Sequence, residues 1–461
     1  MSAEIHIQSF EHLNALFEEK LSDESLYSGS RFSFLKVFQH ALTYEQAGAD
    51  SRILKNYLHW PFAAQQALLL VKALKRGHSN RPKLRKYVFI DPSRNVRDNN
   101  GQWHSIYMKR SIDLFEAAEV SVLNRKQDPN IAADFALNDL TRQFGAPDAD
   151  ELSMLREITH VARHTMRSPV WSERQKAHIL SALHVFYDDF RFYYSLFLNQ
   201  PVKTVIFISH YHNEGLIAAL TVLRIRSVEF QHGLISGNDL YYQYSPVFAK
   251  AVKNAFFPNH ICVYGTYWKQ LLLKGVEFSE SSITVGGEYL WQPDYTTQAP
   301  LRANQVLICA QKNMHAEFVA YARTLFPVMK KHPDWTWVIK MHPLEKNKEL
   351  YRELEKDGFR IVDSEQSLTA LLLESRIQIS IYSTTFFDAL GFDIENYSLQ
   401  AYSIYKDYAA QMIAEKVALP LLIDEDPIEK HLQSNGISSL RPRKEVYGPF
   451  DAKSIRLAIA G

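Results

Sequence analysis

The pattern of apolar and polar residues along the chain changes near residue 200. Before that point most segments repeat their apolar residues at helical spacing, as residues 172–198 do, and KYVFI at 86–90 is the first strand that the pattern predicts. After it, short apolar runs alternate with helical segments of roughly a dozen residues. This alternation predicts βαβ units and therefore parallel sheets.

The alternation occurs twice, and a polar stretch that contains proline separates the two sets. The strands predicted in the first set are residues 202–209, 227–233, 260–265 and 282–287. The strands predicted in the second set are residues 306–311, 335–343, 359–364, 377–383, 398–403 and 419–424. The second set alone would form a complete doubly wound domain of the Rossmann type.

The sequence therefore predicts the α/β class, with two Rossmann-like domains that face each other across a cleft and a helical block at the N-terminus. The length of 461 residues exceeds the size at which single cores stop growing, which also favours two domains. The predicted boundaries are a helical block at 1–84, a first domain at 85–290 with a helical insertion at about 105–200, a linker at 291–305, a second domain at 306–425, and a tail at 426–461 that could pack back on the first domain.

The charge of the chain narrows the class of partner. The formal net charge is +1, whereas proteins that bind duplex nucleic acid usually carry a strong basic excess, so nucleic acid is not an expected partner. A dense basic stretch, Lys72–Lys86, is either a solvated helix end and linker or a dock for anionic lipid headgroups.

The cysteines and the N-terminus indicate a reducing compartment. Cys262 and Cys309 lie in apolar strand-like runs and are typical of small buried side chains. The N-terminus has no basic region followed by an apolar one, and no run approaches the ~20 apolar residues that span a bilayer. We therefore expect a cytoplasmic protein, which could also make peripheral contact with the inner face of the cell membrane.

The first candidate for chemistry lies where the strand WTWVIKMHP ends. Ligands of parallel α/β sheets bind at the edge formed by the carboxyl ends of the strands. Lys340 and His342 share one face of this strand, and Pro343 ends it. A cation and an imidazole at a strand tip suit a phosphate or diphosphate, although a surface lysine and a capping histidine would give the same pattern.

A second polar cluster ends the strand-like run IQISIYS at the same predicted edge. Ser383, Thr384 and Thr385 stand where a helix follows a buried strand, and hydroxyls with free N–H groups at that place can bind an anion. Thr385 and Asp388 also match a capping box. Asp388 is therefore either a helix cap or an acceptor for a ribose hydroxyl.

The first domain offers a third cluster in the run SVEFQHG. Glu229 and Gln231 share a face, and a glutamate in a sheet that is covered on both faces needs a partner or a function. His232 and Gly233 follow at the strand end, where glycine permits close backbone approach. His232 is a candidate general base, and the alternative is a histidine satisfied by hydrogen bonds at a turn.

Other polar residues and glycines also follow strands of the first domain. In SHYHNEG, His210 and His212 lack the carboxylate or cysteine that would complete a metal set, so no metal is expected. Glu214 or His212 could instead contact the acceptor or substrate. Three glycines either line the cleft or form tight turns, and they are Gly265, Gly286 and Gly287.

The runs EFQHG, VYGTYWK, ITVGG, KMHP and YSTTFFDAL occur in the order found in bacterial surface-polysaccharide glycosyltransferases of the GT-B fold. The chain resembles the group that includes capsule and lipopolysaccharide transferases using CMP-linked acidic sugars and the CDP-glycerol glycerophosphotransferases of teichoic-acid synthesis. The resemblance covers roughly residues 200 to 425 and does not extend through the helical N-terminal block.

This resemblance implies roles for several residues. Lys340 and His342 would contact the phosphates of the donor, and Ser383–Thr385 would hold them by hydroxyl and backbone groups. Asp388 stands where many relatives carry a glutamate that binds the ribose, and His232 would deprotonate the acceptor hydroxyl. Transferases of this fold generally work without a bound metal, so no cofactor is expected.

These features together predict a metal-independent glycosyltransferase that moves a sugar from a nucleotide-activated donor, with a CMP-linked sugar favoured, to a growing bacterial capsule or lipopolysaccharide. Its partners would be the nucleotide sugar and a glycan or lipid-linked acceptor. Two alternatives stay open. One is a CDP-glycerol-type polyol-phosphate transferase, and the other is a noncatalytic nucleotide-sugar-binding component of a polysaccharide assembly complex.

Overall fold

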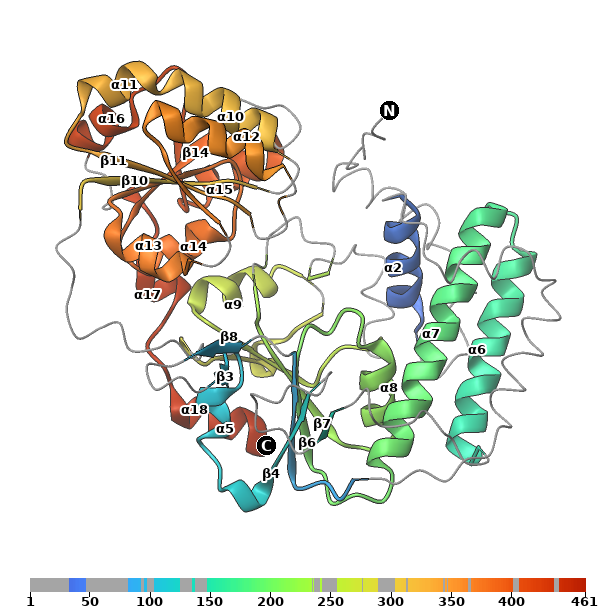
Figure 1. The fold of residues 1–461 in the computed structure, drawn as a ribbon. Coiled ribbons are helices and arrows are strands. Elements are labelled where there is room, and N and C mark those ends of the chain that lie inside the picture. The colour runs from blue at the N-terminus through green and yellow to red at the C-terminus, as the bar shows by residue number, and fades with distance from the viewer. Residues whose placement is uncertain are drawn as a thin grey trace. The chain divides into compact units, whose positions relative to one another are not determined.

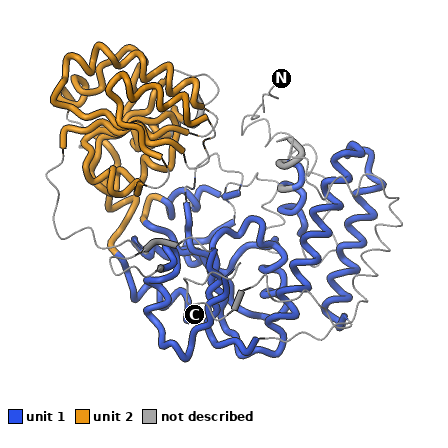
Figure 2. Tube along the Cα trace, in the orientation of Figure 1, with its two compact units in different colours: residues 1–264, 268–293, 450–461 blue, residues 265–267, 294–449 orange. Residues whose placement is uncertain are grey.

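The protein forms two compact units in a computed structural model (Figure 2). Unit 1 comprises residues 1–264, 268–293 and 450–461, and unit 2 comprises residues 265–267 and 294–449. The structure describes residues 33–46, 82–92, 95–97, 103–124, 135–136, 147–233, 235, 241–242, 255–275, 277–288, 303–311, 314–342, 345, 347–363, 366–400, 406–434 and 439–461. Most of the expected block at 1–84 and of the expected linker at 291–305 lies outside these residues.

Unit 1 is built on a seven-stranded parallel sheet with the order β5-β4-β1-β6-β7-β8-β9 (Figure 1). From β1 the chain adds strands on one side, and from β6 it adds them on the other side. A topological switch point therefore lies between β1 and β6, where doubly wound sheets bind ligands. The strands are β1 (Tyr87–Asp91), β4 (Val120–Asn124), β5 (Phe135–Ala136), β6 (Thr204–Ile208), β7 (Arg226–Phe230), β8 (His260–Val263) and β9 (Ile283–Val285).

Helices cover both faces of this sheet because its strands are apolar on both sides. One core joins Val88, Val205 and Phe207 of the strands to helices α2, α6, α7 and α8. On the other side α18 contacts β6, β8 and β9. The helices of this unit are α2 (Leu35–Gln46), α5 (Lys109–Ile112), α6 (Ala149–Arg167), α7 (Glu173–Phe197), α8 (Glu214–Val222) and α18 (Ala452–Ala460), with η2 (Ala117–Glu119) and η5 (Glu280–Ser282).

Unit 2 is built on a six-stranded parallel sheet with the order β12-β11-β10-β13-β14-β15. This is the strand order 3-2-1-4-5-6 of dinucleotide-binding Rossmann folds, and its switch point lies between β10 and β13. The strands are β10 (Gln305–Cys309), β11 (Thr336–Lys340), β12 (Arg360–Val362), β13 (Ile377–Ser380), β14 (Glu395–Leu399) and β15 (Leu419–Leu421).

Neighbouring residues of the unit 2 strands enter different cores, as the alternation of a strand requires. On β11, Trp337 and Ile339 join one core, whereas Val338 joins another with Leu307 of β10. The helices around this sheet are α10 (His315–Thr324), α11 (Phe326–Lys331), α12 (Lys348–Arg352), η6 (Glu353–Asp357), α13 (Leu368–Glu374), α14 (Thr385–Leu390), α15 (Lys406–Ala414), α16 (Pro427–Gln433) and α17 (Arg443–Val446), and α9 (Thr266–Leu272) crosses the boundary between the units.

The predicted α/β class with two Rossmann-like domains is confirmed by these two strand orders. The prediction of a helical insertion at about 105–200 is wrong in its first part, because β4 and β5 lie there and extend the sheet beside β1. The apolar run that forms β4 is only five residues long. Such short runs cannot be assigned to helix or strand by periodicity alone.

Two further short elements complete the description. Strands β2 (Asn95–Arg97) and β3 (Trp103–Ser105) form a separate antiparallel pair. Residues 450–461 of the predicted tail belong to unit 1, whereas residues 426–449 belong to unit 2. Across the described parts of the chain, no helix combines the length and the apolar character that a membrane crossing needs.

Candidate functional site

The carboxyl edge of the unit 2 sheet brings its two predicted polar clusters together. Strands β10, β11 and β13 are adjacent and end at Cys309, Lys340 and Ser380. The side chain of Gln311 spans the switch point, because its amide nitrogen donates to the carbonyl oxygen of Tyr382 and its oxygen accepts from the Tyr382 N–H at 3.1 Å. The loops that follow β10 and β13 are thereby held to each other.

Lys340 has a positioning role at this edge as well as a charge. Its ammonium group donates to the carbonyl oxygens of Asp363 at 2.9 Å and Gln366 at 2.8 Å, which fixes the connection from β12 to α13. Burial lowers the pKa of this half-buried lysine from its ordinary value. His342 lies two residues beyond the end of β11 and is partly exposed, whereas Pro343 lies outside the described residues.

The hydroxyl cluster begins helix α14 in a different way from the one predicted. Thr384 is the N-cap residue and its side chain makes no capping hydrogen bond. The Ser383 hydroxyl instead accepts from the N–H and the hydroxyl of Thr385 at 3.3 Å and 3.0 Å. The predicted capping box of Thr385 and Asp388 is therefore wrong. Three successive hydroxyl residues do not reveal which of them starts the helix.

Asp388 does not cap helix α14, so a capping role does not explain why this carboxylate lies there. Its carboxylate accepts no hydrogen bond from any described residue, and burial raises its pKa to about 6. The thiol of Cys309, at the end of β10, interacts with Lys340, Thr385 and Asp388. Residues from two segments, the end of β11 and the helix α14, thus act on the end of the central strand β10.

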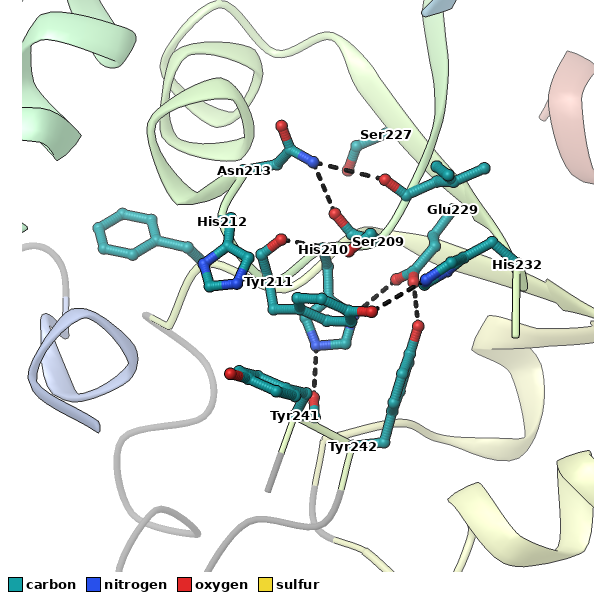
Figure 3. A network of polar contacts seen from close by, with 12 residues as sticks. Ser209, His210, Tyr211, His212, Asn213, Ser227, Glu229, His232, Tyr241 and Tyr242 are labelled. Carbon is teal, nitrogen blue, oxygen red and sulfur yellow. Dashed lines mark hydrogen bonds and ion pairs between the residues drawn. The ribbon is translucent and has the colours of Figure 1, made fainter. Parts of the chain in front are cut away.

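In unit 1, a loop after β6 places an unpredicted tyrosine against His232. The Tyr211 hydroxyl lies 2.9 Å from His232 Nε2, and Figure 3 shows the two side chains pointing at each other. The loop is held by Asn213, whose amide donates to the Ser209 carbonyl oxygen at 2.6 Å. Ser209 and His212 both have left-handed backbone conformations, with φ of 66° and 65°. This conformation is uncommon for residues other than glycine.

Glu229 is fully buried in a closed network. One carboxylate oxygen lies 2.6 Å from His210 Nδ1 and the other accepts from the Tyr242 hydroxyl at 2.6 Å (Figure 3). His210 Nε2 lies 2.9 Å from the carbonyl oxygen of Tyr241. Because a carbonyl only accepts, Nε2 carries a proton, and a second proton lies between Nδ1 and Glu229. The pair of side chains is therefore neutral as a unit.

The surroundings favour ionised Glu229 within this pair. Burial alone would raise the pKa of Glu229, but His210 and the Tyr242 hydroxyl outweigh it and hold the pKa below its ordinary value. With no exposed surface, Glu229 cannot touch a substrate in this structure. Glu229 can therefore affect chemistry only indirectly, through His210, through Tyr242 or through the electrostatic effect of its charge on His232.

A buried lysine that the sequence did not single out lies close to this network. Lys36 of α2 donates to the carbonyl oxygen of Phe256 at 2.7 Å and has no exposed surface. Burial lowers its pKa to about 8, against the attraction of Glu214, Glu229 and Glu277. Glu214, predicted as a contact for the acceptor, is mostly buried at the start of α8 and accepts from the His212 N–H at 3.2 Å.

Gln231 and Gly233 surround the end of β7. The Gln231 amide accepts from the Tyr264 N–H at 3.0 Å and donates to the Gly233 carbonyl oxygen at 2.9 Å, so Gln231 is structural here. A Cβ atom added at Gly233 would meet nothing within 4 Å in the described chain. Among the described residues, the position of a Cβ atom on Gly233 is therefore open.

The other three predicted glycines have local structural reasons. A Cβ atom at Gly265 would lie 2.1 Å from the Glu445 carbonyl oxygen, so this glycine permits α17 to pack closely. Gly286 is buried and hydrogen-bonds Val263 and the Asp451 N–H through its backbone. Gly287 has a φ of 73°. These contacts favour the alternative of tight turns.

The structure adds residues that the sequence pattern did not predict. Gln311 and Lys36 lie in segments without a recognisable motif. The sequence indicated His210 only as one member of the His210–His212 pair that could have bound a metal. Tyr211 and Tyr242 gave no signal, because aromatic residues near strand ends usually belong to a core. Within the described residues, no group of three or more histidine, cysteine or acidic side chains is placed to hold a metal ion.

Comparisons with known proteins were made for sequence and for structure. No protein-family model and no curated protein matches the chain. Among solved structures, the chain is similar to UDP-GlcNAc 2-epimerase from Methanocaldococcus jannaschii, with a TM-score of 0.49, 11% identity, and coverage of 82% of this chain and 100% of that one.

Two further structures show the same level of similarity or less. UDP-GlcNAc 2-epimerase from Neisseria meningitidis bound to UDP-GlcNAc gives a TM-score of 0.47, 12% identity, and coverage of 81% and 98%. MurG from Acinetobacter baumannii gives a TM-score of 0.39, 11% identity, and coverage of 81% and 98%. At such low scores the similarities carry no argument, and the strand orders above establish the two α/β units.

Proposed function

We propose that the protein is a glycosyltransferase that uses a nucleotide-activated sugar, with the donor bound at the carboxyl edge of the unit 2 sheet. One observation carries the proposal. Lys340, at the end of β11, and Thr385 and Asp388, both on α14, interact with the thiol of Cys309 at the end of β10, beside the switch point of a doubly wound sheet. This is the place where nucleotides bind in sheets of this order.

The chemistry of these groups suits a nucleoside phosphate. The ammonium of Lys340 and the imidazole of His342 would face phosphate oxygens, and the exposed hydroxyl of Thr384 could donate to them. Asp388, which accepts no hydrogen bond from the described chain, could accept from a ribose hydroxyl. As the bond between the sugar and the phosphate breaks, the departing nucleotide gains negative charge, and Lys340 would stabilise it.

His232 of unit 1 is the proposed base. It would take the proton of the acceptor hydroxyl while the acceptor oxygen forms its bond to the sugar. Gly233 beside it leaves open space in which an acceptor could lie.

The resemblance of the sequence suggests the finer assignment. We propose a CMP-linked sugar as donor and a growing capsule or lipopolysaccharide chain as acceptor, reached from the cytoplasmic face of the membrane. Mass spectrometry of the product tests this assignment. A product that gains a phosphodiester instead of a glycosidic bond would point to a polyol-phosphate transferase.

Nucleotide binding is the first test. Titration of the full chain with CMP, CDP, UDP, GDP and TDP should reveal one nucleotide that raises the melting temperature, because a ligand of the folded state stabilises it. His342→Ala should weaken that affinity by about tenfold or more, since a charge-assisted hydrogen bond is lost. His315→Ala, a partly exposed histidine on α10, is the matched control. Binding of none of the five, or unchanged binding by His342→Ala, would contradict the donor site.

A further inference from the structure

We propose that Tyr211 is a positioning residue for His232, and that the buried pair of His210 and Glu229 holds Tyr211 in place through residues 241–242. The inference rests on the proposed function only where it calls His232 the base. The contacts themselves lie within unit 1.

Tyr211 is the contact that can orient the His232 ring. Its hydroxyl lies 2.9 Å from Nε2, and the two rings are inclined at 51° with centroids 5.8 Å apart. Tyr107 approaches the other ring edge at 6.4 Å. A hydrogen bond to one ring nitrogen sets both the orientation of a histidine and the proton occupancy of that nitrogen.

Tyr211 is itself held between two consecutive tyrosines. Its ring stacks on Tyr241 at 4.4 Å and 26°, and the ring of Tyr242 meets it edge-on at 5.9 Å and 89°. Figure 3 shows these rings around the hydroxyl that faces His232. The position of Tyr211 therefore depends on where residues 241–242 lie.

The buried pair fixes both of these residues. His210 Nε2 donates to the carbonyl oxygen of Tyr241, and Glu229 accepts from the Tyr242 hydroxyl. One anchor is on the backbone and the other on a side chain, so the segment can neither slide nor rotate without breaking one of them. The contact of His210 with Glu229 joins the two anchors.

Two energetically unfavourable features lie close to Tyr211, and they indicate a functional role for this residue more than a role in packing. Ser209 and His212, on either side of Tyr211 in the loop, adopt left-handed conformations that are unfavourable for residues other than glycine. Glu229 and His210 are a pair of ionisable side chains without solvent contact. Such strain and buried polarity persist where the surroundings hold a group in a required position.

Several elements that pack against His210, Glu229, Tyr211 and His232 contribute titratable side chains to their surroundings. Lys36 on α2 and Glu214 on α8 act on His210, and Glu229 on β7 acts on His232. The other facing groups are Glu277, Tyr107, Tyr211, Tyr241 and Tyr242. A phenol donates hydrogen bonds more readily than it accepts them, so the Tyr211 hydroxyl favours the neutral form of His232.

The test is a titration of His232 in the full chain. Proteins labelled with ¹³C-histidine are followed by NMR between pH 5 and 9, and His232→Gln identifies the signal. Tyr211→Phe should raise the pKa of His232, because water, a better acceptor, replaces the phenol. Tyr194→Phe removes a hydroxyl that bonds Asp148 and should leave His232 unchanged. An unaltered pKa in Tyr211→Phe would overturn the proposal.

A second set of variants tests the anchor. His210→Phe combined with Glu229→Gln removes the pair without leaving an unpaired charge. Its effect on the pKa of His232 should be smaller when Tyr211→Phe is also present, because part of the effect passes through that hydroxyl and only the direct electrostatic effect of Glu229 remains. Additive effects would refute the link between the pair and Tyr211. Near-ultraviolet circular dichroism checks that each variant is folded.

Turnover separates this inference from the proposed function. If Tyr211→Phe shifts the titration but His232→Gln keeps full turnover, the positioning contact stands and His232 is not the base. If His232→Gln abolishes turnover and Tyr211→Phe changes neither the titration nor kcat, the proposed function stands and the inference fails.

Discussion

Replacement of Asp388 by asparagine is expected to stabilise unit 2 at neutral pH. Burial raises the pKa of this carboxyl from 3.8 to about 6, so the folded state disfavours the charged form. The difference of about two units corresponds to about 3 kcal/mol at pH 7, and partial exposure of the side chain reduces this to about 2 kcal/mol. Asparagine has the same shape and carries no charge.

The sign of the pH dependence follows from the raised pKa. Below pH 3.8 the carboxyl is protonated in both folded and unfolded states, so Asp388 imposes no penalty there. As the pH rises toward 6 the unfolded state releases its proton first, and the penalty grows until it is complete above pH 6. Asp388→Asn should therefore stabilise the protein at pH 7.5 and have little effect at pH 4.

Hydrogen exchange with mass spectrometry measures this effect within unit 2. Peptides that cover β10 and β13 should exchange about 30-fold more slowly in Asp388→Asn than in the wild type at pH 7.5, the equivalent of about 2 kcal/mol. Asp424→Asn, at an exposed position of the same unit, is the control. Equal exchange rates in the wild type and Asp388→Asn at pH 7.5, or the same slowing at pH 4, would refute the claim that burial of the charged Asp388 carboxylate destabilises the folded state.

Three further predictions follow from single contacts. Folding lowers the pKa of Lys36 from 10.5 to about 8, so between these pH values the unfolded chain binds one more proton than the folded chain. The free energy of unfolding should therefore rise by about 3 kcal/mol from pH 8 to pH 10.5, relative to that of Lys36→Met. Urea unfolding at both pH values measures this difference. Gly265→Ala places a methyl group 2.1 Å from the Glu445 carbonyl oxygen and should destabilise unit 2 by about 2–3 kcal/mol in thermal unfolding. The methyl group of Gly233→Ala meets no atom of the described residues within 4 Å. This variant should change stability by less than about 0.5 kcal/mol, yet lower turnover by narrowing the space beside His232.

Most of the fold could be predicted because parallel strands leave a local signal. Their continuous apolar runs and the helices between them identified most strands of both sheets, and Lys340 stands at the end of β11. Strand β4 escaped prediction because it is short and lies among helical segments. Strand order could not be read from the sequence, since it depends on pairings between residues far apart in the chain.

The sequence predicted which strand ends carry the polar residues of the site, but it did not predict how these residues contact one another. Alternation along a strand would place His210 and His212 on one face, but the left-handed backbone of Ser209 and His212 turns His210 inward and leaves His212 exposed. The partners of Glu229 are 19 and 13 residues away in sequence. Nothing local indicates that such residues meet.

The most direct test of the proposed function is the release of nucleotide from a panel of nucleotide sugars that includes CMP-linked sugars. We expect the full chain to consume one donor, His342→Ala to bind it about tenfold or more weakly, and His232→Gln to bind it normally with turnover reduced about 100-fold or more. Absence of consumption of any donor, or full turnover by both variants, would contradict a transferase built on these two strand ends.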